Sequence, residues 1–85
     1  MKINVHFLAE DGKKSTQQLE QNFTYRNFVD MVNQLFGPNS HVLYTFVAQG
    51  KNLGVDNEEK FKEKRQLITN SVNIIVGRRM HGGEC

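Results

Sequence analysis

Residues 24–38, TYRNFVDMVNQLFGP, decide the fold class, because their apolar side chains recur at the spacing of one helical face. The residues on that face are Tyr25, Phe28, Val29, Val32, Leu35 and Phe36. Thr24 can cap the first turn, and Gly37 followed by Pro38 supplies a stop. The pattern predicts one well-defined helix over residues 24–36, with a single apolar face that needs a partner.

The segment before this helix predicts a hairpin of two strands. Residues 1–8, MKINVHFL, alternate with a period of two, which is typical of a half-buried strand. The expected inward residues are Met1, Ile3, Val5 and Phe7. Asp11-Gly12 is a turn signal, and residues 15–23 predict a second strand that is more polar.

The segment after the helix predicts two further strands and a short helix. Residues 41–49, HVLYTFVAQ, predict a third strand that leads into a tight turn at 50–54. Residues 56–65 place acids first and bases last, the order that the helix dipole favours, so we expect a short helix anchored by Phe61. Residues 71–76, SVNIIV, alternate again and predict the last strand.

The order of these elements predicts an α+β fold. One main helix packed across one mixed sheet would bury the apolar faces with few residues. The first and last strands are strongly apolar on their inward faces, and the helix-containing connection allows them to pair in parallel. A chain of 85 residues has room for one such domain and one core, which makes a large internal active-site cavity unexpected.

The composition is that of an ordinary globular domain, with 38% apolar and 24% charged residues. No stretch approaches about 18 apolar residues, and the start lacks the pattern of a signal peptide. A net charge of +2 is too small to indicate nucleic-acid binding, and Cys85 has no second cysteine to pair with. We expect an intracellular monomer, cytoplasmic and also nuclear, that binds neither membranes nor nucleic acid.

Three parts of the chain together resemble a ubiquitin-like protein. Residues 1–8 resemble the first strand of that family in length and alternation. Residues 47–53, VAQGKNL, resemble the exit of its third strand into a tight turn. The chain then closes with a strand, two arginines, a hydrophobic residue and Gly82-Gly83, as the family does. The chain departs from the family by apparent insertions in the first hairpin and between Gly54 and Arg65, and by a poorly matched segment before the last strand. It therefore resembles a divergent relative.

The resemblance implies a ubiquitin-like β-grasp domain at residues 1–77, followed by a flexible tail at residues 78–85. It also implies a protein modifier, whose Gly83 carboxylate is activated with ATP, passed through cysteine thioesters and joined to lysines of target proteins. The implied partners are activating, conjugating and ligase enzymes. A processing cysteine protease would first cut after Gly83, because Glu84 and Cys85 leave that residue without a carboxylate.

Other tail residues also match the family's pattern. Gly82 has no side chain and lets the tail enter a narrow cleft, while Arg78, Arg79 and His81 would orient it on an activating enzyme. His81 stands where ubiquitin has an arginine, so a dedicated activating enzyme is an option. The alternative for residues 78–85 is a frayed, solvated end or a boundary inside a longer polypeptide.

The family's main recognition surface is a small exposed apolar patch, to which Leu8, Val47 and Ile75 would contribute from outward-facing positions. Gly77 stands where a further apolar member is expected, which makes the patch thinner. The alternative is a surface without a partner, because scattered exposed aliphatic residues are ordinary. Lys51 stands where the family carries a chain-forming lysine, although surface lysines usually serve solubility alone.

The residues indicate no enzyme, metal site or cofactor site. Cys85 has no arranged histidine and aspartate partners, and it fits no prenylation motif. His6, His41 and His81 lack metal-ligand spacing, and one cysteine cannot complete a zinc site. We therefore expect a protein on which enzymes act, with no catalytic residue, metal or cofactor of its own.

Two other functions fit the same residues. One is a ubiquitin-like interaction domain at the front of a larger protein, which is not conjugated and recruits a proteasome, ligase or protease through the apolar patch. The other is a sulfur carrier with a thiocarboxylate on Gly83. Such carriers generally expose the glycine without processing, so Glu84 and Cys85 count against it.

Overall fold

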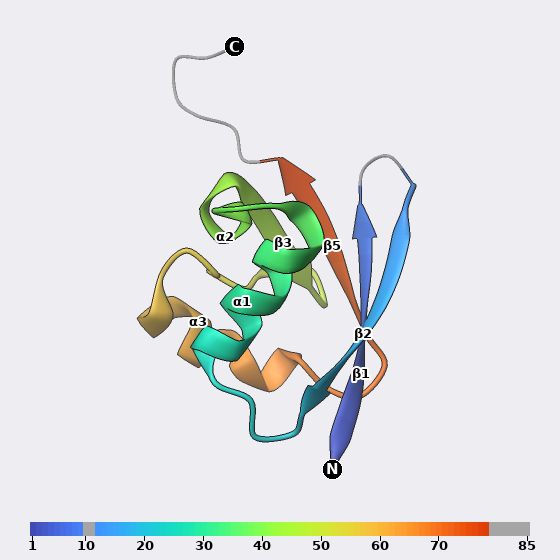
Figure 1. Cartoon of the computed structure of the whole chain (residues 1–85). Helices are drawn as coiled ribbons and strands as arrows, with labels where there is room; N and C mark the ends of the chain where they lie inside the picture. The colour runs from blue at the N-terminus through green and yellow to red at the C-terminus, as the bar shows by residue number, and fades with distance from the viewer. Residues whose placement is uncertain (10–11, 79–85) are drawn as a thin grey trace.

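In the part of the chain that the structure describes, residues 1–9 and 12–78, five strands form one mixed sheet in the order β2-β1-β5-β3-β4 (Figure 1). The structure is a computed structural model. The strands are β1 (Lys2–Ala9), β2 (Lys14–Glu20), β3 (Tyr44–Ala48), β4 (Lys51–Asn52) and β5 (Val72–Arg78). β1 and β5 pair in parallel at the centre, with Phe7 opposite Ile74, and the other neighbouring strands are antiparallel. The predicted mixed sheet and the predicted parallel pair are confirmed.

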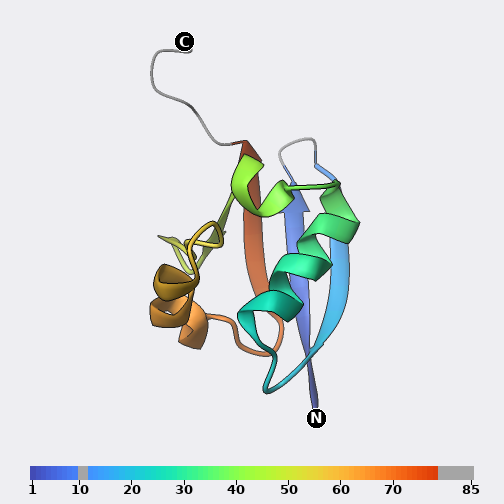
Figure 2. The ribbon, with the colours of Figure 1, turned by 60° about the vertical axis from the view of Figure 1, so that its left-hand side comes forward.

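Helix α1 (Tyr25–Phe36) crosses one face of this sheet, as Figure 2 shows. A reciprocal cap begins the helix. The Asn27 N–H donates to the Thr24 hydroxyl at 3.1 Å, and the Thr24 N–H donates to the Asn27 side-chain oxygen at 3.0 Å. Gly37 ends the helix with a φ of 106°, and its N–H donates to the Asn33 carbonyl at 3.0 Å. The predicted main helix is therefore confirmed, with its cap and its stop.

The core is a cluster of aromatic rings between α1 and the sheet. Phe28 of α1 is fully buried at its centre. The ring centroid of Phe28 lies 6.1 Å from that of Phe7 and 6.2 Å from that of Phe46, both on the sheet. On its other side the ring centroid of Phe61 lies 5.1 Å away. Burial of each phenylalanine stabilises the fold by about 1.5–3 kcal/mol. Because Phe28 contacts both the sheet and Phe61, it links α1 to both.

Helix α3 (Glu58–Lys64) covers the side of the core next to α1. Its cap is Asn57, whose side-chain oxygen accepts from the Glu59 N–H at 2.9 Å. Phe61 is fully buried, which confirms the predicted short helix and its anchor. The helices found in residues 1–9 and 12–78 are all too short or too polar to span a lipid bilayer.

A 3-10 turn, η1 (Arg65–Leu67), follows α3 and carries the arginine that closes this end of the core. The Arg65 guanidinium lies 4.1 Å from the centre of the Phe23 ring and donates to the Phe23 carbonyl at 2.6 Å. The cation–π contact and the hydrogen bond together fix the loop before α1. The pairing joins residues 42 positions apart, so no local pattern could have predicted it.

The start of the predicted third strand is instead a short helix, α2 (Ser40–Leu43). The strand prediction was wrong for residues 41–43, and β3 begins only at Tyr44. Asn39 adopts a left-handed conformation with a φ of 65°, which turns the chain away from an extended path. The hydroxyl of the buried Ser40 donates to a backbone carbonyl three residues earlier and holds the turn.

The ends of β1 and β5 differ slightly from the prediction. Met1 was expected on the inward face, but it precedes β1 and is 96% exposed, so that expectation was wrong. β5 runs through Arg78, one residue past the predicted domain end at residue 77. Arg78 is therefore part of the sheet.

Candidate functional site

The outward faces of three neighbouring strands carry a row of three aliphatic side chains. In the register, Leu8 of β1 lies opposite Ile75 of β5, and Ile75 lies opposite Val47 of β3. Neighbouring strands are about 4.8 Å apart, so these side chains are within reach of one another. Ile75 is 55% exposed and Leu8 is 40% exposed, whereas Val47 is half-buried. We call Leu8, Ile75 and Val47 the outer row.

Alternation within each strand produces the outer row. The residue before each of its members points into the core: Phe7 in β1, Ile74 in β5 and Phe46 in β3. None of these three is more than 1% exposed, so each strand is anchored on one face and open on the other. The structure thus brings the predicted patch residues together as one strip. Their use in binding stays a prediction.

Polar residues and a glycine surround the outer row. Its two ends meet Lys14 on β2 and Asn52 on β4. Two positions further along β5 on the same face, Gly77 lies opposite Thr45 of β3. Two positions back along β1 on the same face lies His6. Gly77 adds no side chain, so the strip is narrow, as the sequence indicates. A small apolar centre with a polar rim suits a weak and reversible contact with a partner.

Lys51 lies at the start of β4, after a tight turn made by Gln49 and Gly50. Both turn residues have positive φ values, 53° and 80°, as a two-residue hairpin turn requires. Lys51 pairs with Ala48 across the hairpin and is exposed. Its amine is accessible, and its role as a chain-forming lysine stays a prediction.

Arg78 is the last residue of β5, where it pairs with Tyr44 of β3, and it is exposed. The other tail residues with predicted roles lie outside the described residues: Arg79, His81, Gly82, Gly83, Glu84 and Cys85. Their roles therefore stay predictions. The strand that leads into them is the one that carries Ile75, the central member of the outer row.

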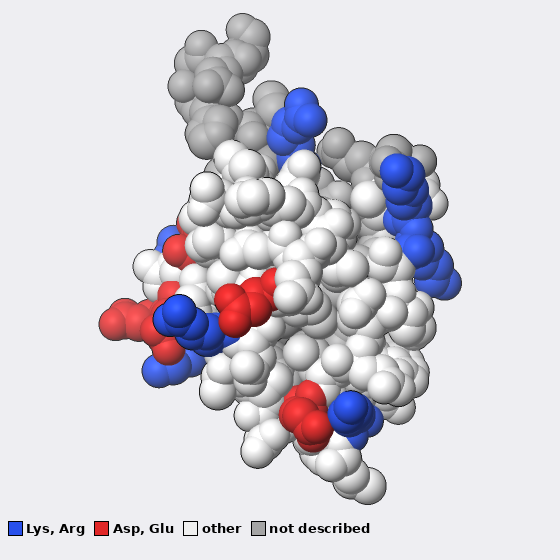
Figure 3. Space-filling model, viewed as in Figure 1, with Lys and Arg blue, Asp and Glu red and all other residues white. Residues whose placement is uncertain are grey.

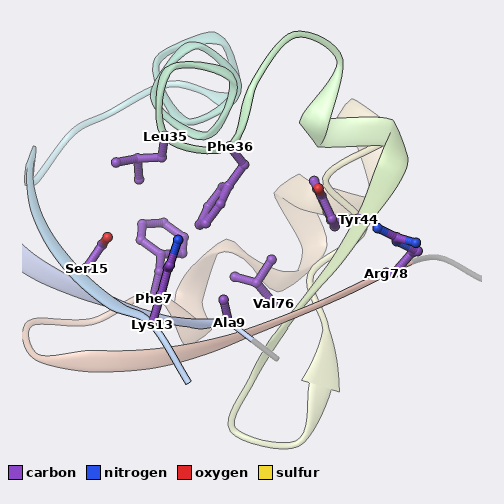
Figure 4. A pocket seen from close by; sticks show the side chains of 9 residues that line it. All are labelled: Phe7, Ala9, Lys13, Ser15, Leu35, Phe36, Tyr44, Val76 and Arg78. Carbon is purple, nitrogen blue, oxygen red and sulfur yellow. The ribbon is translucent and has the colours of Figure 1, made fainter. Parts of the chain in front are cut away.

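Clefts open on the side of the sheet that carries the helices. One cleft of about 360 Å³, here named the basic cleft, lies between the end of α1, the β1–β2 hairpin and the adjoining ends of β3 and β5 (Figure 4). Its defining residues are Lys13, Arg78, Phe7, Leu35, Phe36 and Val76. Another of about 360 Å³, the acidic cleft, is defined by Asp30, Glu58, Tyr25, Arg26 and His41. Figure 3 shows basic side chains around the hairpin and the end of β5, whereas acidic and basic side chains are mixed over α3.

Tyr25 joins the acidic cleft to the loop before α3. Its hydroxyl donates to the Val55 carbonyl at 2.6 Å. Burial, and then the carboxylates of Asp56 and Glu58, raise the pKa of the Tyr25 phenol above its ordinary value of 10.0. The phenol therefore stays protonated, and remains a donor, throughout the physiological pH range.

The alternation of residues along the strands predicts the outer row, but no sequence pattern predicts either cleft. Lys13, Phe36 and Arg78 come from three separate parts of the chain, so no motif marks the basic cleft before the chain is folded. Within residues 1–9 and 12–78, no three histidine, cysteine, aspartate or glutamate side chains come together in a way that could hold a metal ion.

Comparisons with known proteins identify the fold. A protein designed de novo on the basis of ubiquitin is similar with a TM-score of 0.63 and 14% identity, over 99% of this chain and 96% of that one. A computationally designed protein based on the template of human erythrocytic ubiquitin, solved by NMR, is similar with a TM-score of 0.62 and 18% identity, over 95% of this chain and 96% of that one. No protein-family model matches the sequence, and no curated protein matches it either.

The chain has the ubiquitin-like β-grasp fold, a mixed sheet with one main helix packed across it. Identities of 14% and 18% establish the fold alone. Both neighbours are designed proteins, so function has to be argued from the residues of this chain.

Proposed function

We propose that the chain is a ubiquitin-like protein modifier, cut after Gly83 and conjugated through the Gly83 carboxylate to lysines of target proteins. The observation that supports this most is that β5 carries the central residue of the outer row and also leads into the tail. This strand holds Ile75 at the centre of the outer row and leads, through Arg78, into the segment that contains Gly82-Gly83. An enzyme that contacts the outer row would have the tail within reach.

The composition of the tail suits entry into an enzyme. The five residues after β5, 79 to 83, would reach about 16 Å if extended at about 3.3 Å each, which is enough to carry Gly83 away from the domain. Glycines at positions 82 and 83 remove the side chains that would block a narrow passage. Arg78, Arg79 and His81 supply hydrogen-bond donors that would orient the tail on an activating enzyme.

The chemistry uses the Gly83 carboxylate and the cysteines of partner enzymes. The carboxylate attacks the α-phosphorus of ATP, which releases pyrophosphate and forms an acyl adenylate. A thiolate of the activating enzyme displaces AMP, and the acyl group then passes to a thiolate of a conjugating enzyme. With a ligase, the amine of a target lysine displaces that thiolate and forms an isopeptide bond. In this scheme the chain is the transferred group and contributes no catalytic residue.

Glu84 and Cys85 fit a precursor of this modifier. While they are attached, Gly83 has a peptide carbonyl in place of a carboxylate, so it cannot be adenylated. A processing cysteine protease would hydrolyse the bond between Gly83 and Glu84. The processed chain would act as a monomer in the cytoplasm and nucleus, with the activating, conjugating and ligase enzymes as its partners.

The outer row by itself also favours a second function, a ubiquitin-like interaction domain that is not conjugated. Leu8, Ile75 and Val47 form one strip whose contact with a partner needs no tail chemistry. Such a domain would recruit a proteasome, ligase or protease. Covalent attachment is therefore the property that separates the two functions.

An epitope-tagged chain expressed in its own cells tests this difference. The tag is placed before Met1, which is 96% exposed and lies at the other end of the molecule from the end of β5 (Figure 1). A modifier should give species of higher mass that survive boiling in detergent and reductant. Gly83→Ala should abolish them, because an added side chain blocks passage of the tail, while the chain stays folded.

Val47→Asp is the matched variant for the outer row, because it leaves the tail intact. Species of higher mass that persist in Gly83→Ala would contradict the tail chemistry. An interaction domain should give no covalent species but should capture a partner that Val47→Asp loses. Unchanged capture by Val47→Asp would exclude the outer row as the contact surface.

A further inference from the structure

The basic cleft shares Arg78 with the tail of the proposed function, but its other lining residues have no part in that function, and its size is that of a small-ligand site. Its volume is about 360 Å³. Ligand clefts in proteins hold about 300–1,000 Å³, so the basic cleft lies near the lower end of that range. This volume fits a small organic molecule.

The floor of the basic cleft is apolar. Phe7 is 1% exposed and Val76 is 3% exposed, so both are anchored in the core below. Phe36 packs edge-on against Phe7, with their ring centroids 5.8 Å apart, and Leu35 adds an aliphatic wall (Figure 4). Phe7 and Val76 leave almost no surface open, so the half-buried side chains of Leu35 and Phe36 provide the apolar surface that a ligand could contact.

The rim of the basic cleft is cationic. Lys13 and Arg78 both line the cleft, and Figure 4 shows Arg78 at one end of it, beside Tyr44. No aspartate or glutamate is found among the described residues that line the cleft. Within residues 1–9 and 12–78, the Arg78 guanidinium has no hydrogen-bond or ion-pair partner. A guanidinium offers donors in a planar fork that matches a carboxylate, so Arg78 can pair with an anion at the rim.

The acidic cleft provides a comparison within the same molecule. It has the same volume, about 360 Å³, but its rim carries Asp30 and Glu58 against one arginine, Arg26. Of the two clefts, the basic cleft is therefore the one that suits a ligand with an apolar part and an anionic end. The charge of the rim, and not the volume alone, selects between them.

We propose that the basic cleft binds a small organic carboxylate with an aliphatic chain of medium length. The carboxylate pairs with the Arg78 guanidinium at the rim. The aliphatic chain lies against the half-buried side chains of Leu35 and Phe36, above the core that contains Phe7. Binding involves no covalent step and no conjugating enzyme, so this proposal does not depend on the proposed function.

NMR titration of the isotope-labelled full chain with octanoate tests this proposal. Octylammonium serves as a probe of the same chain length and opposite charge. Octanoate should shift the amide signals of Phe7, Leu35 and Phe36, with a dissociation constant on the order of 1 mM. Octylammonium should leave these signals unchanged at the same concentrations. Arg78→Gln should weaken octanoate binding about three- to fivefold, because the pair with this exposed guanidinium is lost.

Lys14→Gln is the matched control for Arg78→Gln. It also removes one cation from this end of the sheet, but Lys14 lies opposite Leu8 on the outward face. Its dissociation constant for octanoate should stay within about twofold of the parent chain, because a screened surface charge outside the cleft contributes little. The proposal is overturned if octylammonium binds as well as octanoate, or if Arg78→Gln weakens binding no more than Lys14→Gln does. Shifts centred on the outer row would overturn it as well.

Discussion

The two faces of the sheet are built from the same strands but have different physical roles. In β5, Ile74 is fully buried under α1, whereas its neighbour Ile75 is 55% exposed on the outer row. In β1, Phe7 is 1% exposed and Leu8 is 40% exposed. The side-chain period of two thus places one side chain of each pair in the core and leaves the next one exposed, within a single strand. The comparison implies that the outer row can change without unfolding the chain, whereas the covered face cannot.

The largest expected effect is on the covered face, at Phe28. Phe28→Ala removes the ring that contacts the sheet and α3, so it should lower the free energy of unfolding by about 3–5 kcal/mol. That loss is a large fraction of the 5–15 kcal/mol that is typical of a domain. Urea unfolding followed by circular dichroism measures it. A loss below about 1 kcal/mol would contradict the central place given to Phe28 in the core.

Ile74 and Ile75 are adjacent in β5 but lie on opposite faces of the sheet, so the same substitution at each position compares the two faces. Ile74→Ala leaves a cavity in the core and should lower the free energy of unfolding by about 2–5 kcal/mol. Ile75→Ala removes the same atoms from an exposed position and should lower it by less than about 1 kcal/mol. Urea unfolding of both variants measures the difference. Equal losses would mean that the two faces contribute alike to stability, which would contradict this comparison.

A smaller effect is expected at the cap of the helix that covers the sheet. Thr24→Ala removes the acceptor for the Asn27 N–H and should lower the free energy of unfolding by about 1 kcal/mol. Thr24→Ser keeps a hydroxyl at this position and should recover most of the loss. Thermal and urea unfolding measure both variants. If serine and alanine behave alike, the capping hydrogen bond is not the cause.

The smallest effect is expected at alkaline pH, from Tyr25. Burial and the nearby carboxylates raise the pKa of this phenol in the folded chain above 10.0, so the unfolded chain releases the proton first. The free energy of unfolding should therefore fall as pH rises from about 10 through the raised pKa, with no loss from this group below that range. Tyr25→Phe should show a shallower alkaline fall in urea titrations. An identical fall in parent and variant would contradict the raised pKa.

The sequence predicts those parts of the fold that depend on neighbouring residues. Thr24, Asn27 and Gly37 begin and end α1 through local hydrogen bonds, so the helix follows from its own segment. Period-two alternation likewise placed Leu8 and Ile75 on the outward face. Residues 41–43 were predicted wrongly, because three residues are too few to show a period and the turn depends on the left-handed backbone of Asn39.

The rest of the candidate site depends on how distant segments meet. The register that sets Ile75 between Leu8 and Val47 follows from pairing of three strands, which alternation does not determine. Lys13 and Arg78 share a cleft because the hairpin and the end of β5 lie beside the end of α1. Neither arrangement has a signal within any one segment.

Mass spectrometry of the cells that make this chain tests the central claim most directly. Trypsin cuts after Arg79, so a conjugated chain leaves the four residues Met-His-Gly-Gly on a target lysine. The account predicts peptides with this remnant that vanish when the gene is deleted, and an unconjugated chain whose intact mass ends at Gly83. A chain recovered solely with residues beyond Gly83, and no lysine bearing the remnant, would contradict the modifier.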